Sequence, residues 1–327
     1  MATWRQVLRA TGVLLVSLLT AATALAQEPY PGSREVHVIV TWAPGSTPDI
    51  LTRYFSENMR PFLGGTIVVE NKVGASGNIG MTDVAKAKSD GYTVLSAAPS
   101  GIAAGPSLFK NPGYDPSQFA MLGSLCRFAF TVSVAANSPH NTLQSLIAAV
   151  RTKGASTSYG TISKSSQVLG AMMKNILKLE AVEVPYRTSP DSLNDLNSGA
   201  LDYVMYDTGF ALPRHREGKL RVLAVTSKER MNGIAPDIPT MDESGVPGVD
   251  VTGWWGIVVP AGVPQPIKDK ISSAFLKMAE KPETKKWLTE SYFDPSVIGP
   301  AEAQAQMIKD IKKWAEWVKL ANLEPKG

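Results

Sequence analysis

A polar loop between a predicted strand and a predicted helix is the part of this sequence best suited to chemistry. Residues 36–40 are apolar apart from His37, and Ala-Pro-Gly-Ser at residues 43–46 leads into Thr47 and Pro48. Proline is favoured at the first position of a helix, and a threonine or serine before it can cap the free N–H groups there. We therefore predict that Thr47 caps a helix whose positive end faces an anion.

Four further polar loops follow predicted strands, at residues 74–78, 96–100, 161–166 and 186–191. Hydroxyls and backbone amides in such loops can hold a carboxylate without an arginine. Ordinary helix caps are the alternative interpretation of each loop taken alone, and the occurrence of five of them favours binding. The loop residues expected to contact a solute are Pro44, Gly45, Ser46, Thr47, Asp49, Ser76, Asn78, Ser100, Thr161, Ser163, Lys164, Ser165, Ser166, Arg187, Thr188 and Ser189.

Catalytic and metal-binding motifs have no counterpart in the sequence. The three histidines, His37, His140 and His215, are scattered, and no His-x-Glu-x-x-His, paired cysteine or Gly-x-Ser-x-Gly pattern is present. The glycine-containing loop at residues 74–78 lacks the lysine of a phosphate-binding Walker loop. Cys126 is the single cysteine, so no internal disulfide can form. We expect a protein that is not an enzyme and binds neither metal nor cofactor.

Composition and charge indicate an exported globular protein. Arg5 and Arg9 flank an apolar stretch at residues 13–22, and Ala24-Leu25-Ala26 resembles a signal-peptidase site, so residues 1–26 are predicted to be a signal peptide and the mature chain periplasmic. Removal of that segment takes away two arginines and no acidic residue, which leaves 31 basic and 29 acidic residues. This near-neutral balance gives no support for nucleic-acid binding, and a monomer is expected.

The elements that must position these loops alternate along the chain, which predicts a mostly parallel sheet covered by helices. Strands are expected near residues 35–41, 66–70, 92–97, 121–126, 128–135, 157–160, 181–184, 202–206, 221–225 and 250–259. Helices are expected near residues 48–59, 79–88, 142–153, 167–178, 190–198, 210–217, 266–280, 283–291 and 301–320.

The length of 327 residues favours two lobes. No flexible linker separates them, so the chain is expected to cross between the lobes twice, near residues 120–135 and 250–260. The first lobe would comprise residues 27–125 and 255–327, and the second residues 126–254. Solutes bind beyond the carboxyl ends of the strands in such sheets, so both lobes would face one cleft.

Several stretches, taken in order, resemble the solute receptors of tripartite tricarboxylate transporters, the TctC or Bug family. The resemblance covers most of the mature chain. It rests on Val-Thr-Trp-Ala-Pro-Gly-Ser-Thr-Pro-Asp at residues 40–49 and on Val-Glu-Asn-Lys-Val-Gly-Ala-Ser-Gly-Asn-Ile-Gly at residues 69–80. Asp-Gly-Tyr-Thr at residues 90–93, Val-Pro-Tyr-Arg at residues 184–187 and Gly-Trp-Trp-Gly at residues 253–256 follow in the family's order.

The resemblance implies an α/β fold of two Rossmann-like lobes with a ligand cleft between them, as in type II periplasmic binding proteins. It also implies capture of a carboxylated metabolite by lobe closure and its transfer to an integral-membrane permease pair. Carried over by motif, it adds Asp207, which follows Tyr206 where the family has a Phe-Asp pair. Lys164 and Thr188 depart from the family pattern and could reshape the second-lobe half of the pocket.

Trp42 bears on the shape of the solute, because the family usually has phenylalanine at this position. A tryptophan facing the cleft would favour an aromatic or elongated dicarboxylate, and a core position for Trp42 is the alternative. Two other functions stay open at this point. One is a periplasmic enzyme that uses Asp207 or Asp49 as a base, and the other is a receptor that signals to a sensor protein.

Overall fold

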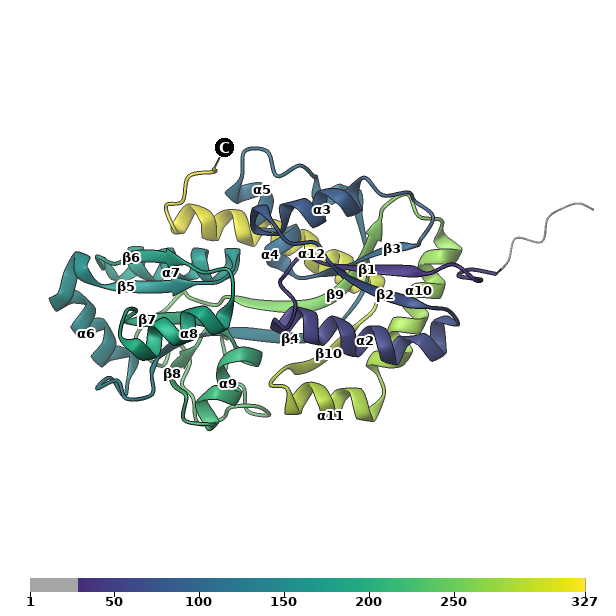
Figure 1. The fold of residues 1–327 in the computed structure, drawn as a ribbon. Coiled ribbons are helices and arrows are strands. Elements are labelled where there is room, and N and C mark those ends of the chain that lie inside the picture. Colours follow the sequence, from purple (N-terminus) through teal and green to yellow (C-terminus); the bar gives the residue numbers. More distant parts are fainter. Residues whose placement is uncertain (1–28, 327) are drawn as a thin grey trace, which may run out of the picture.

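The computed structural model describes residues 29–326, and the predicted signal peptide lies outside the described residues. Two groups of strands and helices lie side by side and are joined by two long strands, β4 (Phe119–Ala135) and β9 (Thr252–Pro260) (Figure 1). We call the group at the right of Figure 1 the first lobe and the group at the left the second lobe. The predicted α/β fold with two lobes is confirmed. No helix between residues 29 and 326 is long and apolar enough to cross a membrane.

The first lobe holds the N-terminal and C-terminal parts of the chain. Its strands are β1 (Val36–Val40), β2 (Ile67–Asn71), β3 (Thr93–Ala97) and β10 (Asp294–Ile298). Its helices are α2 (Thr47–Leu63), α3 (Asn78–Ala85), α4 (Pro99–Ile102), α5 (Gly105–Leu108), α10 (Gln265–Ala279), α11 (Pro282–Glu290) and α12 (Pro300–Leu320).

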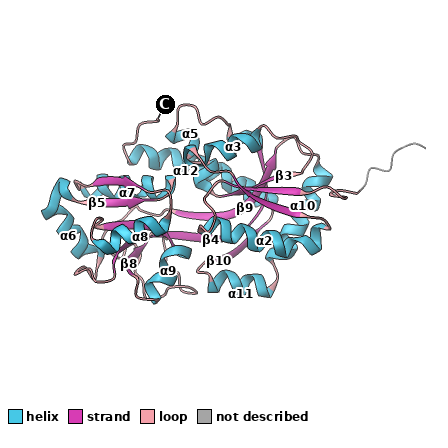
Figure 2. Cartoon of the chain, viewed as in Figure 1, coloured by secondary structure: helices cyan, strands magenta, loops and turns pink. Residues whose placement is uncertain are grey.

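The second lobe holds the middle of the chain. Its strands are β5 (Ser158–Thr161), β6 (Val182–Pro185), β7 (Tyr203–Asp207) and β8 (Leu220–Val225). Its helices are α6 (Leu143–Lys153), α7 (Lys164–Leu177), α8 (Ser189–Ser198) and α9 (Thr208–Arg216). Figure 2 shows the strands of both lobes between their covering helices.

The strands of the described residues form one mixed sheet in the order β2-β1-β3-β9-β4-β7-β5-β6, with β8 and β10 also paired to β4. β1 is parallel to β2 and β3, and β5 is parallel to β6 and β7. The ladders of β9 with β3 and β4, and of β4 with β7, β8 and β10, are antiparallel. The prediction of a mostly parallel sheet is therefore wrong, because the chain enters the second lobe along β4 and returns along β9 in the opposite direction.

Helix α2 shows how the sequence holds the first lobe together. Its residues Leu51, Phe55, Met59 and Leu63 are four apart, so they share one face, and all are buried. Phe55 meets Phe275 of α10 edge to face, with ring centroids 5.5 Å apart. Gly64, at φ 81°, ends the helix in the left-handed conformation that glycine adopts without steric cost. This packing fixes the direction in which the first turn of α2 points.

Helix α12 contacts both lobes. It packs against β4, α4 and α5 and also reaches α7 of the second lobe, where the side-chain amide of Asn175 donates a hydrogen bond of 3.1 Å to the carbonyl of Leu320. The predicted lobe boundaries at residues 125 and 254 fall inside β4 and β9. Helix α12 therefore adds a packing contact between the lobes to the two strands that carry the chain across.

Candidate ligand-binding site

A cavity lies between the lobes, where loops that follow strands of both lobes meet. The crossing strands β4 and β9 contribute Phe128, Phe130 and Trp255 to it. The remaining lining residues come from the loops and helix starts of the two lobes: Trp42, Ser46, Thr47, Pro48, Ser100, Ile162, Ser163, Ser165, Ser189, Met205, Tyr206 and Asp207.

Four helices of at least two turns begin at this cavity. Thr47 starts α2, Ser163 precedes α7, Ser189 starts α8 and Asp207 precedes α9. The first N–H groups of a helix have no partner inside it, and the helix end carries a partial positive charge. Four such ends around one cavity make a favourable environment for an anion.

The start of α2 differs from the prediction. Ser46, not Thr47, is the N-cap residue, and no side chain caps the helix. The Ser46 hydroxyl instead donates a hydrogen bond of 2.6 Å to the carbonyl of Ala43. Thr47 is already helical, and its side chain lies beside the carboxyl group of Asp207 of the other lobe, where it acts to lower the pKa of that carboxyl. The predicted cap at Thr47 is wrong, because the helix begins one residue earlier than the cap rule placed it.

The start of α7 is closed by a capping box. The Ser163 hydroxyl accepts a hydrogen bond of 3.2 Å from the backbone N–H of Ser166, and the Ser166 hydroxyl accepts one of 2.8 Å from that of Ser163. Reciprocal capping of this kind satisfies two otherwise free donors. Ser163 and Ser165 line the cavity, whereas the hydroxyl of Ser166 is engaged in the hydrogen bonds of the cap.

Lys164 and Asn78 were both predicted to contact a solute, and they contact each other instead. The Lys164 ammonium group donates a hydrogen bond of 2.7 Å to the side-chain oxygen of Asn78, and both residues are buried. The Phe109 ring lies near the same ammonium group, with its centroid 5.1 Å away. Burial lowers the pKa of Lys164 to about 8. This contact joins α7 of the second lobe to α3 of the first, outside the cavity.

The other predicted residues outside the cavity have local roles or face solvent. Asp49 is buried and accepts hydrogen bonds from the backbone N–H of Gly45 (2.9 Å) and from the side chains of Arg53 and Asn71. Bonds from these three donors hold the pKa of the Asp49 carboxyl below its usual value.

Thr161 and Thr188 also serve local structure. The Thr161 hydroxyl donates to Glu183 at 2.7 Å, and Thr188 caps α8 by accepting from the backbone N–H of Asp191 at 3.3 Å, as its sequence pattern predicted. The residues that face solvent are Pro44, Gly45, Ser76 and Arg187.

Aromatic side chains form one side of the cavity. Trp255 stacks on Phe128 with ring centroids 5.2 Å apart and meets Trp42 edge to face, also at 5.2 Å. The buried indole N–H of Trp255 has no hydrogen-bond partner among residues 29–326. Phe128 and Phe130 were not among the residues predicted to line the site. Their spacing of two in a strand puts them on one face, which is the signal that could have found them.

Asp207 is the carboxylic acid among the described residues that line the cavity. It caps α9 by accepting a hydrogen bond of 3.0 Å from the backbone N–H of Phe210. Burial raises the pKa of the Asp207 carboxyl, because removal from water disfavours the charged form. The bonds from Phe210 and Thr47 and the positive charge of Arg214 act in the opposite direction without cancelling that effect.

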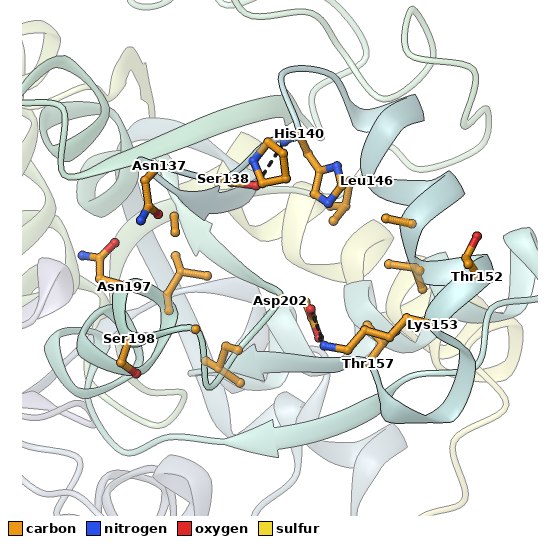
Figure 3. Close-up of a pocket in the computed structure, with 17 residues that line it drawn as sticks. Asn137, Ser138, His140, Leu146, Thr152, Lys153, Thr157, Asn197, Ser198 and Asp202 are labelled. Atoms are coloured by element: carbon orange, nitrogen blue, oxygen red, sulfur yellow. Dashed lines mark hydrogen bonds and ion pairs between the residues drawn. The ribbon is translucent and has the colours of Figure 1, made fainter.

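A second hollow, of about 680 Å³, lies at the outer end of the second lobe, between α6, the loop after β4 and the end of α8 (Figure 3). Lys153 and Asp202 form an ion pair of 2.6 Å at its edge, and the labelled Asn137, His140 and Asn197 surround it in Figure 3. The described residues contain no group of three or more histidines, cysteines or acidic residues placed to hold a metal ion.

Comparisons with known proteins agree on one family. A family model described as "Tripartite tricarboxylate transporter family receptor" matches residues 51–323. The structure of the periplasmic binding protein BugD is similar, with a TM-score of 0.83 at 33% identity, over 90% of this chain and 99% of that one. Rpa4515 of R. palustris with adipate has a TM-score of 0.85 at 28% identity, over 91% of this chain and 100% of that one. MatC from Rhodopseudomonas palustris with bound malate has a TM-score of 0.80 at 26% identity, over 87% of this chain and 99% of that one.

Proposed function

Since this chain belongs to the tripartite tricarboxylate transporter receptor family, we propose that it captures a small organic carboxylate in the cavity between its lobes. The captured acid is handed to an integral-membrane permease pair, and the mature protein works in the periplasm. Adipate and malate in two similar structures support a carboxylate as the solute class.

The observation that carries this proposal is the convergence of four helix N-termini and their hydroxyls on one cavity between the lobes. In this arrangement Thr47, Ser163, Ser165 and Ser189 hold solute oxygens together with the backbone N–H groups beside them. Hydrogen bonds from such neutral donors can hold a carboxylate without a side-chain cation in the cavity. Closure of the lobes completes the site, since the donors come from both of them.

The aromatic side of the cavity supports a solute with a flat or extended apolar part. Trp42, Trp255 and Phe128 offer ring faces and edges between the polar loops. An elongated dicarboxylate would place its chain or ring against them and its carboxylates against the helix starts. We therefore propose adipate-like or aromatic dicarboxylates ahead of a compact acid such as citrate.

A thermal-shift and calorimetry panel tests this function with adipate, phthalate, malate, citrate and an amino acid. A solute present at about a hundred times its Kd raises the free energy of unfolding by about 2.7 kcal/mol, so each solute of the panel that binds gives a measurable shift of the thermal transition. Adipate or phthalate should give the largest shift. Recovery of the acid unchanged after long incubation distinguishes capture from turnover. The proposal fails if no carboxylate shifts the transition.

Two variants separate the cavity from its surroundings. Ser165→Ala removes a cavity hydroxyl and should weaken adipate binding about tenfold, the effect of one lost hydrogen bond to a charged group. Arg187→Gln is the matched control, because Arg187 was predicted as a ligand contact and faces solvent instead. Its affinity should equal that of the wild type. Equal loss in both variants would contradict the cavity as the binding site.

A further inference from the structure

The charge of the cavity is unusual for a site that takes an anion. Within the described part of the chain, its lining residues include no lysine, arginine or histidine, and one of them, Asp207, is an acid. A carboxylate that enters the cavity therefore meets a carboxyl group and finds no side-chain cation to offset it.

The cation whose charge reaches Asp207 is the Arg214 guanidinium, and Arg214 is not among the residues that line the cavity. On α9, the Arg214 guanidinium lies over the Phe210 ring, 3.6 Å from its centroid, and donates to the carbonyl of Phe210 at 2.9 Å. On α2, the nearby ion pair joins Arg53 and Asp49 at 3.0 Å.

The other elements next to Asp207 carry charged side chains that are ion-paired or hydrogen-bonded within the protein. On β4, Arg127 pairs with Asp294 of β10 at 2.9 Å, and on α8 the carboxylate of Asp191 accepts from the Thr188 hydroxyl at 2.5 Å. The group that touches Asp207 from the facing lobe is the neutral hydroxyl of Thr47.

Two carboxyl groups close together in a site shielded from water do not both stay ionised. They share one proton, as in paired catalytic carboxylates, because the like charges repel and one pKa rises. The shared proton also forms a short hydrogen bond between the two groups, which is stronger than a neutral one. Burial of Asp207, with its pKa already raised in the free protein, favours this outcome.

We infer that a solute carboxylate binds beside Asp207 in a pair that shares one proton, so that capture takes up a proton from solution. The inference rests on the proposed function, and it makes the affinity for the acid depend on pH through Asp207. The proton comes from water or buffer and resides between an Asp207 oxygen and a solute oxygen. Release of the acid returns it. No covalent bond forms or breaks.

Calorimetry with adipate in two buffers of different ionisation enthalpy measures the protons taken up on binding. The wild type should take up as much as one proton per adipate at pH values where Asp207 of the free protein is ionised, and its affinity should fall by up to about tenfold per pH unit there. Asp207→Asn mimics the protonated side chain, so uptake should disappear and adipate should bind more tightly than to the wild type at pH 8. Asp191→Asn, an exposed acid at the start of α8, is the matched control and should keep the uptake.

The outcomes separate this inference from the proposed function. Adipate binding without proton uptake in the wild type would overturn the inference alone, and so would loss of binding in Asp207→Asn with its fold intact by circular dichroism. Absence of adipate binding to the wild type counts against the proposed solute class and the inference together.

Discussion

At the residue scale, the contact between Thr47 and Asp207 joins the two sides of the cavity. Both residues were predicted from the sequence to lie in the site, Thr47 from the cap pattern and Asp207 from the family resemblance. Their contact could not be predicted, because 160 positions separate them and neither residue carries a periodic signal for the other. The predicted role of the Thr47 hydroxyl as the cap of its own helix was wrong. Sequence patterns predict where a helix begins. The residue that contacts the Thr47 side chain depends instead on which residues of the other lobe lie next to it.

Asp207→Asn should change the pH dependence of stability in the free protein. An acid whose pKa is raised on folding binds protons more tightly in the folded state, so its contribution to stability is lost as pH rises from about 4 through the raised pKa. The free energy of unfolding of the wild type, relative to Asp207→Asn, should therefore increase as pH falls from 7 to 5. Urea unfolding at both pH values measures it, and a relative decrease would contradict the raised pKa.

At the element scale, most helices and strands were predicted within a few residues, because their amphipathic patterns are strong. The structure merges the two strands expected at residues 121–126 and 128–135 into β4. Arg127 separates those two apolar runs and is exposed, and it stays in the strand by pairing with Asp294 of β10. The short α4 and α5 were not predicted, since each has too few residues to show a period. β10 was not predicted because its sequence, Asp-Pro-Ser-Val-Ile, has no alternation of apolar and polar residues and includes a proline.

Helices α7 and α3 contact each other through Lys164 and Asn78. A buried ammonium group without a carboxylate partner costs stability, and the N-terminal end of α7 adds an unfavourable dipole. Because the pKa of Lys164 is about 8 in the folded protein and about 10.4 when unfolded, the unfolded state binds more protons between these values, and stability rises with pH.

Replacement of Lys164 by methionine removes this dependence. The wild type should gain about 2.5 kcal/mol relative to Lys164→Met between pH 7 and pH 10. Urea unfolding at the two pH values checks this, with Lys174→Met, at the other end of α7, as the control. A constant difference between wild type and Lys164→Met would show that the ammonium group is not desolvated in solution.

At the scale of the whole molecule, function depends on how closely the lobes approach. Gly209, in the first turn of α9, lies where the first lobe meets the second. A Cβ atom there would lie 2.7 Å from Cζ of Phe293 and 2.9 Å from Cγ2 of Thr47, both in the first lobe. Glycine at this position therefore permits the two lobes to approach each other as closely as they do here.

Gly209→Ala should hold the lobes apart without unfolding either. Alanine is favoured in a helix, and the clash falls on side chains of the other lobe. Overpacking of this kind costs about 1–3 kcal/mol, so adipate affinity should drop at least about fivefold, with an increased radius of gyration in the presence of adipate. Gly199→Ala, where no atom lies within 4 Å of the added Cβ, is a control for the glycine substitution itself, although its φ of 82° adds local strain. Unchanged affinity in Gly209→Ala would show that binding does not need this closure.

The overall fold and the existence of a cleft could be predicted from the alternating elements and the missing linker. The packing of α12 against α7 of the second lobe could not be predicted, because the apolar stripe of α12 indicates a buried face and does not indicate which lobe covers it. Contacts such as Asn175 with Leu320 join positions 145 residues apart, and only the assembled structure brings them together.

A crystal structure of the wild type saturated with its tightest-binding acid from the panel tests the central claim most directly. The account predicts one acid between the lobes, with carboxylate oxygens within hydrogen-bond distance of the starts of α2 and α7 and its apolar part against Trp42 and Trp255. An acid bound elsewhere, such as in the hollow beside Lys153 and Asp202, with the cavity between the lobes empty, would contradict it.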